Sequence, residues 1–345
     1  MRMLLVNRTF AFCLFFILLC NDGFAQLKQE LEEKKPAKIE IESLEREVVE
    51  KKEEKKIKKL FSSLELSSSY ETNPRLTVIR KGDSSGHLKY SLFPKRLLFQ
   101  GFLFSFNYDF DGTVYGEFND LTNILNHTRF SFDKSLNKFL NFGTGYDFSS
   151  FYYPTDQGSD FYFHKGFVYF RHNITRDMYH QLMLEEGVKD YPHSRAYLDS
   201  TTTFQDSNRR DYRHGVEYSL GAFLMNKLFF RLRAKFSIND SNALFQDYYD
   251  YKSYDISPYF NYKISEKYSL SLSVMMTKTD YIDRLVNART YARRDRIFNG
   301  NIGMRYTINK NNNVSLGYGY NESKSNDSST EYSGSTINCG WQYKF

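Results

Sequence analysis

A repeated alternation of apolar and polar residues over long stretches constrains this chain more than any other feature. In residues 228–238, apolar side chains at the even positions alternate with Arg231, Arg233, Lys235 and Ser237. Residues 138–150, 268–276 and 313–321 follow the same rule. Successive side chains of a strand point to opposite faces, so a period of two predicts strands with one apolar and one polar face. The stretches are long enough for a tilted membrane crossing, which takes ~9–11 residues.

Composition narrows the class of protein. Aromatic residues make up 18% of the 345 residues, yet the mean hydropathy is −0.59. A helical membrane protein needs ~20 consecutive apolar residues for each span, and no such run follows the N-terminus. An aromatic-rich, polar and strand-like chain favours a β-barrel in which alternate residues face lipid. A soluble all-β protein is the alternative. The net charge of +6 comes with no concentrated basic cluster, so nucleic acid is not expected as a partner.

The first 25 residues have the pattern of a secretory signal peptide. Arg2 and Arg8 precede and flank the apolar run TFAFCLFFILLC, and Gly23 and Ala25 supply small residues before a cut near residue 25. Cys20 raises the alternative of a lipid anchor, but Leu19 stands where that modification needs a small residue. Cleavage leaves Cys339 as the only cysteine, so no intrachain disulfide is expected.

Residues 26–60 differ from the rest of the chain. They are dense in Glu, Lys and Arg, and Glu-to-Lys spacings such as Glu47–Lys51 favour helix. The apolar stripe of Ile41, Leu44 and Val48 is short, so we predict a solvated, partly helical periplasmic linker. A short coiled coil or a docking segment for a periplasmic partner is the alternative. The predicted domains are therefore a signal peptide (1–25), a charged linker (26–60) and a strand-rich domain (61–345).

The links between the predicted strands alternate in length. Short links are predicted at 111–112, 135–137, 175–177, 224–226, 265–267 and 309–312. Longer polar links are predicted at 73–95, 119–123, 151–160, 192–208, 240–247, 282–292 and 322–330. Short turns at one rim and longer loops at the other are typical of outer-membrane barrels. This count gives fourteen strands with both ends on the short-turn side, or twelve without the 111–119 hairpin. Pro258 predicts a bulge or local break in its strand.

The fold class that follows is all-β: a transmembrane antiparallel up-and-down barrel of about fourteen strands, preceded by a charged segment. The sheet must close because no backbone amide can stay unpaired in hydrocarbon. We expect the last strand to close the ring against the first, around residues 62–71. Tyrosines on the outward parity are predicted to form girdles near the two membrane interfaces: Tyr70, Tyr108, Tyr212, Tyr262 and Tyr343.

The C-terminal stretch NCGWQYKF resembles the targeting signal of Gram-negative outer-membrane proteins. Asn338, Gly340, Tyr343 and Phe345 match its order of a polar residue, a glycine, an aromatic and a terminal hydrophobic residue. The resemblance implies recognition by the barrel-assembly machinery and a place in the bacterial outer membrane. It covers about eight residues, and the rest of the chain has only the general character of porin-like barrels, with no specific family assignable.

The polar parity predicts the lining of the lumen. A positive stripe of Arg231, Arg233 and Lys235 would favour anions, unless Glu185 and Glu217 neutralise it and hold the wall rigid. Both possibilities stay open at the level of sequence. The predicted lumen-facing residues are Arg129, Glu185, Arg213, Glu217, Arg231, Arg233, Lys235 and Arg305.

No motif in the sequence predicts catalysis. His193 and Ser194 are adjacent, so their side chains diverge in an extended chain, and His127, His164, His172, His180 and His214 lack ligand spacing. We predict no enzyme activity, no catalytic residue, no metal and no cofactor.

Two functions compete at this stage. The first is a porin-like channel for passive diffusion of small hydrophilic solutes. The second is a non-conducting surface-exposed binding, export or assembly scaffold, with the N-terminal arm plugging the lumen or contacting a periplasmic partner. Outer-membrane lipids and lipopolysaccharide are expected partners in either case.

Overall fold

The computed structural model describes residues 60–77, 81–94, 96–99, 101–286 and 291–345. The predicted signal peptide and residues 26–59 of the predicted linker lie outside the described residues. No helix in these described ranges is long and apolar enough to cross a membrane.

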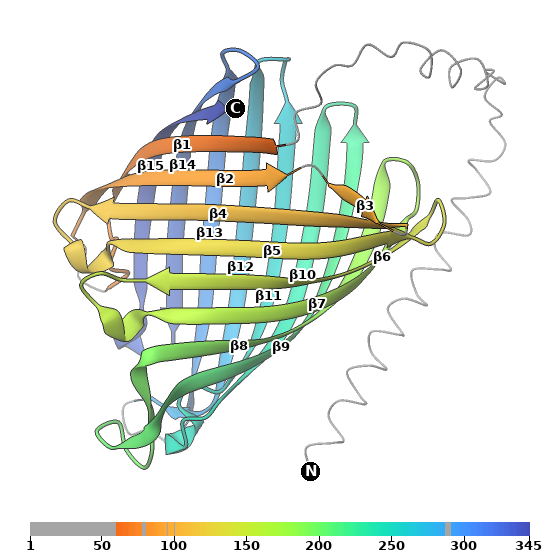
Figure 1. Ribbon diagram of the computed structural model, residues 1–345. Helices are drawn as coiled ribbons and strands as arrows, with labels where there is room; N and C mark the ends of the chain where they lie inside the picture. The colour runs from red at the N-terminus through yellow and green to blue at the C-terminus, as the bar shows by residue number, and fades with distance from the viewer. Residues whose placement is uncertain (1–59, 78–80, 95, 100, 287–290) are drawn as a thin grey trace, which may run out of the picture. The chain divides into compact units, whose positions relative to one another are not determined.

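Strands make up almost all of the described chain (Figure 1). Four single-turn 3₁₀ helices lie in the connections: η1 (Asn119–Leu121), η2 (Gln157–Ser159), η3 (Phe245–Asp247) and η4 (Ser328–Thr330). The strands are β1 (Leu60–Glu71), β2 (Asp83–Pro94), β3 (Leu97–Phe99), β4 (Phe102–Tyr115), β5 (Asn123–Ser135), β6 (Leu140–Tyr152), β7 (Phe161–Asn173), β8 (Met178–Tyr197), β9 (Phe204–Met225), β10 (Leu228–Ser241), β11 (Tyr251–Lys263), β12 (Tyr268–Leu285), β13 (Ala292–Thr307), β14 (Asn312–Ser325) and β15 (Tyr332–Lys344).

The strands close into an antiparallel barrel. Each strand from β4 to β15 pairs with the next, β15 pairs with β1, β1 with β2, and β2 with β4. The three-residue β3 pairs only with β4 and stands outside the ring, which leaves fourteen strands in it. The closing pair β1–β15 runs from Ser63↔Lys344 to Glu71↔Thr336. Closure of fourteen strands by this pair confirms the predicted fold class.

Two predicted links near the N-terminal end of the barrel were wrong, and their errors cancelled in the count. The predicted long link at 73–95 contains β2. The predicted hairpin at 111–112 does not exist, because β4 runs through it from Phe102 to Tyr115. Asp-Gly is a common turn pair, but here Asp111 pairs with Lys89 and Gly112 with Leu88 in the ladder between β2 and β4. The alternative of twelve strands is therefore also wrong.

The asymmetry of the links agrees with the prediction. One rim has turns of two to four residues at 136–139, 174–177, 226–227, 264–267 and 308–311, and a longer link between β2 and β4 that contains β3. The other rim has the longer links 72–82, 116–122, 153–160, 198–203, 242–250, 286–291 and 326–331. The predicted loop at 192–208 shrinks to 198–203, because β8 and β9 extend past their neighbours as a paired hairpin. Following the predicted orientation, we call the rim with the longer links the outer rim. The rim with the short turns is called the periplasmic rim.

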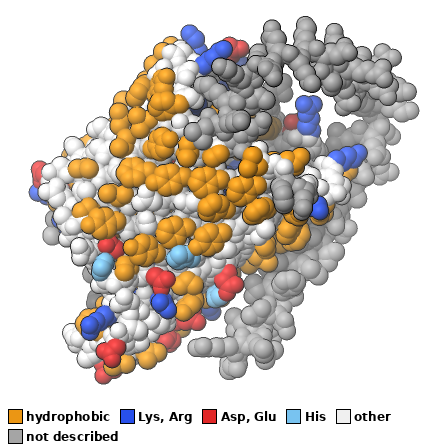
Figure 2. Space-filling view, viewed as in Figure 1, with side chains coloured by type: hydrophobic (Ala, Val, Ile, Leu, Met, Phe, Trp, Pro, Cys, Tyr) orange, Lys and Arg blue, Asp and Glu red, His pale blue; other side chains and the backbone are white. Residues whose placement is uncertain are grey.

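The two parities of each strand separate cleanly. Large apolar side chains such as Leu66, Leu272, Ile302 and Leu316 are 42–52% exposed on the outward face. Figure 2 shows hydrophobic side chains forming a continuous patch over the middle of one face, with charged side chains gathered toward β8 and β9. The opposite parity is polar and points into the barrel.

The predicted tyrosine girdles are placed outward, with one correction. Tyr70 and Tyr262 are 52% and 42% exposed near the ends of their strands, and Tyr212 is 43% exposed where β9 pairs with the end of β10. Tyr108 instead lies in the middle of β4, where its hydroxyl donates to Asn126 Oδ1 at 2.9 Å. A hydroxyl at that depth needs a protein partner, because lipid offers none.

Pro258 interrupts the sheet without a bulge. It pairs with Leu232 of β10, but neither Ser257 nor Pro258 pairs with β12. Ile256↔Met276 and Tyr259↔Ser273 keep the same register on either side of the gap. The local break was predicted; the alternative of a bulge is not what the structure shows.

Candidate functional site

The interior wall of the barrel is the candidate site. All eight predicted lumen residues lie on the inward parity: Arg129 on β5, Glu185 on β8, Arg213 and Glu217 on β9, Arg231, Arg233 and Lys235 on β10, and Arg305 on β13. They do not form one cluster. The residues on β5–β10 belong to a charged wall, whereas Arg305 lies alone among small side chains.

An ion-pair ladder begins on β4 and runs sideways across the charged wall. His127 lies between two carboxylates, with Nδ1 3.8 Å from Asp109 and Nε2 3.7 Å from Asp147. Asp147 also meets Arg129 Nε at 3.0 Å and Lys165 Nζ at 3.2 Å. The Asp147 side chain is 7% exposed. A carboxylate this buried needs these cations, since an unpaired charge there would be costly.

The ladder continues to β10 through Glu185. Lys165 Nζ lies 3.4 Å from Glu185 Oε2, and Lys235 Nζ contacts Glu185 Oε1. Glu185 is on β8 and Lys235 on β10, so this contact spans the intervening strand β9. Gly215 makes the contact possible: a Cβ there would lie 2.8 Å from Glu185 Cγ. A glycine under a charged side chain therefore joins two strands that are not neighbours.

The predicted positive stripe on β10 is neutralised at one end and free at the other. Lys235 contacts Glu185, and Arg233 Nη1 lies 3.9 Å from Glu217. Among the residues that the structure describes, no carboxylate lies within 4.0 Å of Arg231, whose guanidinium is 5.5 Å from the Tyr259 ring. The cations of β10 are therefore paired toward the outer rim, and Arg231 is unpaired among the described residues toward the periplasmic rim.

The interior beneath the outer rim is packed with aromatic rings and cations. Arg209 bonds both oxygens of Asp211, at 2.9 and 2.5 Å, and its guanidinium lies 4.1 Å from the Tyr191 ring and 3.3 Å from the Tyr249 ring. Asp211 is 1% exposed. Nearby, Arg213 donates to Asn239 at 2.9 Å. Arg213 therefore belongs to this packed cluster and not to an open lumen.

The opposite wall, formed by the crossing parts of β12–β15, carries small side chains. A cavity of about 360 Å³ lies along it. Arg305 faces this cavity near the periplasmic rim and has no carboxylate within 4.0 Å among the described residues. The inward residues that line this cavity include Ser269, Ser271, Ser273, Asn301, Gly303, Ser315, Gly317, Gly319, Thr336 and Asn338.

Inward charges are distributed unequally around the ring. The inward charged residues of β1–β6 are mostly carboxylates, and those of β7–β11 are mostly cations. In Figure 1, β10–β13 run behind β2, β4 and β5. The β1–β6 carboxylates are Glu65, Glu71, Asp83, Asp109, Asp111, Asp133 and Asp147, with Lys89 and Arg129 as cations. The β7–β11 cations are Lys165, Arg171, Lys189, Arg209, Arg213, Arg231, Arg233, Lys235 and Lys263, with Glu185, Asp211, Glu217 and Asp255 as carboxylates.

The residues of the C-terminal motif occupy both faces of the closing strand. Asn338 and Gly340 point inward, and Gly340 pairs with Ser67. Tyr343 points outward with its ring 4.8 Å from that of Phe345. The Phe345 amide donates to Ser62 O at 2.9 Å, so the last residue is still bonded to the first strand.

One inward polar cluster was missed at the level of sequence. His87 Nε2 lies 3.1 Å from Ser69 Oγ and 3.0 Å from Ser85 Oγ, and Nδ1 is 2.9 Å from Thr113 Oγ1. His87 Nδ1 is hydrogen-bonded to the hydroxyl of Thr113. In the catalytic triad of a hydrolase, a carboxylate would be bonded to this nitrogen and would orient the ring. The cluster therefore ties β1, β2 and β4 together. Recognising the parity of Ser85, His87 and Lys89 as a strand would have found it.

A second histidine contact also escaped the sequence analysis. His172 Nδ1 on β7 lies 3.0 Å from His180 Nε2 on β8, although the sequence shows no ligand spacing for either residue. Two ligands alone do not make a metal site. The described residues contain no group of three or more His, Cys, Asp or Glu side chains placed to hold a metal ion.

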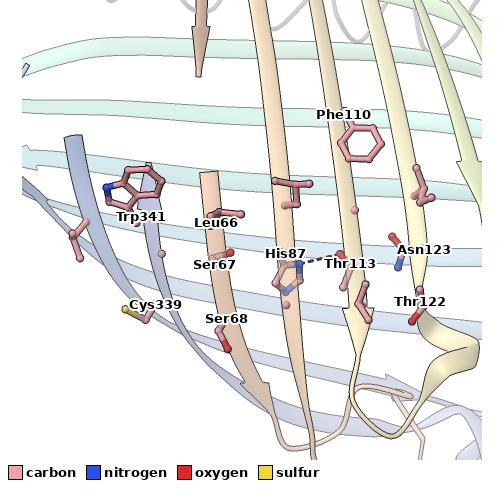
Figure 3. A pocket seen from close by; sticks show the side chains of 17 residues that line it. Leu66, Ser67, Ser68, His87, Phe110, Thr113, Thr122, Asn123, Cys339 and Trp341 are labelled. Carbon is pink, nitrogen blue, oxygen red and sulfur yellow. Dashed lines mark hydrogen bonds between the residues drawn. The ribbon is translucent and has the colours of Figure 1, made fainter. Parts of the chain in front are cut away.

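An apolar depression of about 760 Å³ lies on the outward face across β15, β1, β2, β4 and β5 (Figure 3). Leu66, Phe110 and Trp341 surround it, and the small residues Gly86 and Gly112 form part of its floor. Its largely apolar lining is what a lipid-facing surface requires.

No protein-family model and no curated protein matches the sequence. Solved structures do match in fold. Outer-membrane expressed OmpT of Vibrio cholerae has a TM-score of 0.50 at 10% identity over 83% of this chain and 97% of that chain. The anion-selective porin from Comamonas acidovorans has a TM-score of 0.48 at 9% identity over 83% and 98%. The chain thus shares the closed-barrel fold of a solved outer-membrane protein, and no specific family can be assigned to it.

Proposed function

We propose that this chain is a channel of the bacterial outer membrane through which small hydrophilic solutes diffuse passively, with a preference for anions. One observation carries the proposal. Arg231, Asn301, Arg305 and Asn338 point into the barrel and are nevertheless exposed to solvent. Inward side chains of a small, filled barrel would be buried, whereas fourteen strands enclose more space than side chains fill. Exposure of these four residues supports a wet lumen in the periplasmic half.

The anion preference rests on the unpaired cations. Arg231 and Arg305 lie on the inward face near the periplasmic rim without a carboxylate partner among the described residues. Lys263 adds a third inward cation at the end of β11. Uncompensated positive charge on the wall of a pore raises the concentration of anions in the lumen and lowers that of cations.

Conductance in planar bilayers tests the channel. Protein refolded without residues 1–25 is expected to give steady ohmic steps, and its reversal potential in a KCl gradient should report chloride preference. The double variant R231S/R305S should lose that preference and keep its conductance. K267S/K310S, which removes two cations from the periplasmic turns, is the matched control and should keep the preference.

The same recordings distinguish the competing function. Silence from the full mature chain contradicts an open channel. Silence that ends when residues 26–59 are deleted supports the non-conducting scaffold with a plugging arm. A heat-modifiable gel shift in detergent shows that the barrel is folded in each preparation, so silence is not mistaken for misfolding.

We also propose that the barrel-assembly machinery reads the C-terminal strand. Support comes from the motif at the end of β15 and from the Phe345 amide bonded to Ser62 at the closing seam. Deletion of Phe345 should lower the amount of heat-modifiable barrel in outer membranes. In-vitro refolding of the same variant separates loss of recognition from loss of the closing contact.

A further inference from the structure

A cluster of cations lies on the outward face at the outer rim of β11–β14. Lys278, Arg296 and Lys324 occupy one row of the ladder on three adjacent strands, since Lys278 pairs with Arg296 and Arg296 with Lys324. Lys252 and Arg294 lie in the next row, on either side of Asp280. We call these five residues the outer cation patch.

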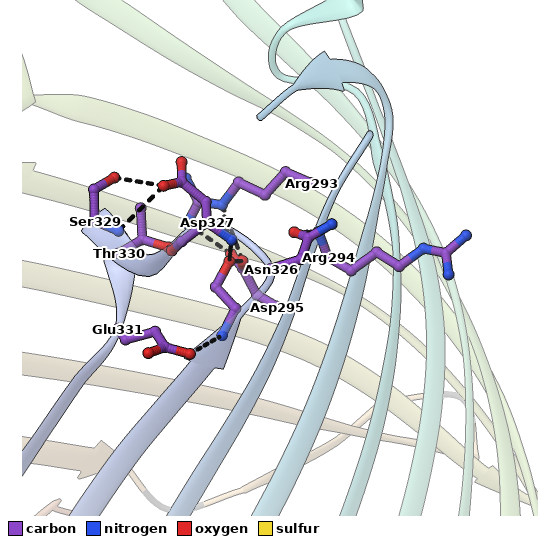
Figure 4. Close-up of polar contacts among 9 residues, drawn as sticks. Arg293, Arg294, Asp295, Asn326, Asp327, Ser329, Thr330 and Glu331 are labelled. Carbon is purple, nitrogen blue, oxygen red and sulfur yellow. Dashed lines mark hydrogen bonds and ion pairs between the residues drawn. The ribbon is translucent and has the colours of Figure 1, made fainter. Parts of the chain in front are cut away.

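The patch lies directly above the apolar belt. On β12 the outward residues from the periplasmic rim are Tyr268, Leu270, Leu272, Val274 and Met276, and Lys278 comes next. On β13, Phe298 ends the apolar series and Arg296 follows. Figure 4 shows Arg294 pointing away from Arg293 and Asp295, which bond each other on the inward side. The outer cation patch therefore marks the level at which acyl chains end and headgroups begin.

Protein carboxylates neutralise only part of this charge. Asp280 lies 2.7 Å from Lys278 and 3.7 Å from Arg294, and Glu322 lies 3.5 Å from Lys324. Arg296, at the centre of the row, has no carboxylate within 4.0 Å among the described residues. The Lys278, Arg294 and Lys324 side chains are 48–73% exposed.

Three like charges side by side in a strand ladder oppose folding. Like charges directly opposite one another destabilise a sheet, and neighbouring strands lie only ~4.8 Å apart. A local arrangement that works against the fold points to a function that compensates for it. An anion with several charges, spaced to reach adjacent strands, would remove this repulsion.

Other sectors of the outer rim lack this imbalance. On β8 and β9 the outward charges pair locally: Asp190 with Arg210 at 2.7 Å and Glu186 with His214 at 3.3 Å. On β1, β2 and β4 the outward residues at this level are Tyr70, Ser84 and Val114. Among the described residues of these sectors, the excess of outward positive charge lies on β11–β14 alone.

We propose that the outer cation patch binds the phosphorylated headgroup of an outer-leaflet glycolipid, whose acyl chains lie on Met276, Phe298 and their neighbours. Two phosphates on one sugar headgroup complement a row of three cations, and the apolar belt below supplies the surface for the chains. This inference rests on the proposed location in the outer membrane. It is independent of whether the lumen conducts.

The test uses the folded mature chain in nanodiscs of phosphatidylcholine with added bisphosphorylated lipid A, and measures bound lipid A by native mass spectrometry. In the variant K278Q/R296Q/K324Q we expect affinity to fall about 100-fold, on the order of fivefold for each removed cation. K227Q/K267Q/K310Q removes the same charge from the periplasmic turns and should bind as the unmodified chain does.

Two further probes identify the ligand chemistry. Dephosphorylated lipid A should bind the unmodified chain as weakly as bisphosphorylated lipid A binds the triple variant. Vesicles containing phosphatidylglycerol should compete poorly, because single phosphates cannot bridge the row. Equal binding by the triple variant and the control, or undiminished binding of dephosphorylated lipid A, would overturn the proposal. Strong competition by phosphatidylglycerol would replace it with a general anionic-lipid surface.

Failure here and failure of the channel are separable. Conductance is recorded for the same preparations in bilayers of phosphatidylcholine alone, where lipid A is absent. A triple variant that conducts but does not bind lipid A supports both proposals. A folded chain that binds lipid A and stays silent contradicts only the channel.

Discussion

The two halves of the interior wall solve the same problem in opposite ways. On β4–β10, inward polar residues are large and charged, and most of them pair with one another through the ladder from Asp109 to Lys235. Arg231 is the exception, with no carboxylate within 4.0 Å among the described residues. On the crossing parts of β12–β15 the inward polar residues are small and mostly uncharged, and Asn301 and Asn338 are exposed. We call these the charged wall and the small-residue wall.

The position of a residue on the inward face of a strand determines that its side chain is polar. It does not determine whether protein groups or water supply the partners of that side chain. Side chains long enough to reach across neighbouring strands pair with one another and exclude water. Serine and asparagine reach at most an adjacent strand, as the Ser271 hydroxyl does in donating to Gly303 O at 3.3 Å, so water must satisfy their remaining hydrogen-bonding groups. The charged wall therefore contributes stability through pairing, whereas the small-residue wall contributes space. Variants that disturb each wall should consequently differ in size of effect.

The largest effect is expected from Glu185→Gln. Glu185 contacts both Lys165 and Lys235 while its side chain is only 9% exposed. Removing its charge leaves two half-buried ammonium groups short of a partner, which should lower the free energy of unfolding by about 3 kcal/mol. Urea titration of refolded protein in lipid vesicles measures the change.

Asn301→Ala on the small-residue wall is the control for this variant. Asn301 is exposed to the lumen, so we expect a loss below about 0.5 kcal/mol. Equal losses in the two variants would show that the walls do not differ in the way described.

A smaller effect is expected from Gly215→Ala. This substitution disturbs the contact between Glu185 and Lys235 by a steric clash and removes no charge. The added Cβ would lie 2.8 Å from Glu185 Cγ and Oε1, so Glu185 must move off Lys235. Overpacking of this kind costs about 1–3 kcal/mol. Gly86→Ala places a methyl group where nothing lies within 4 Å and should leave stability nearly unchanged. The difference between the two alanine variants, measured by the same urea titration, isolates the clash.

The fold was predictable because period-two alternation survives on most strands. Parity alone placed Arg231, Arg233 and Lys235 inward, whereas the links gave fourteen strands only because two errors cancelled. Parity failed where glycine and charge interrupt it: Gly86, His87 and Lys89 concealed β2, and Asp111-Gly112 imitated a turn. In each case the ladder with a neighbouring strand decided the structure, and that neighbour is not local in sequence.

The pairing within the site was not predictable from the sequence. Whether Lys235 is neutralised depends on Glu185, which lies two strands away and reaches it only over Gly215. Parity states that both side chains point inward but gives no register between strands. The distinction between the charged wall and the small-residue wall therefore needed the closed ladder, although the residue types were visible in the sequence.

The most local expected effect concerns two outer loops, one above each wall, in which a buried and a partly exposed carboxylate respond to pH in opposite directions. Burial raises the pKa of Asp250 to about 7 despite a bond from the Ser241 amide, with Asp240 and Asp247 adding to the rise. A bond from the Ser329 hydroxyl is the main cause that lowers the pKa of Asp327.

The two pH effects have opposite signs because folding raises the pKa of Asp250 and lowers the pKa of Asp327. Between about pH 4 and 7 folded Asp250 keeps a proton that the unfolded chain loses, so loop 242–250 should become less protected as pH rises through this window. Folded Asp327 stays ionised below its ordinary pKa, so loop 326–331 should become less protected only as pH falls below about 4. Hydrogen exchange of both loops, corrected for intrinsic rates, measures this. Asp250→Asn keeps an acceptor for Ser241 and should abolish the first pH dependence without touching the second. A variant that still loses protection between pH 4 and 7 would assign the effect to another group.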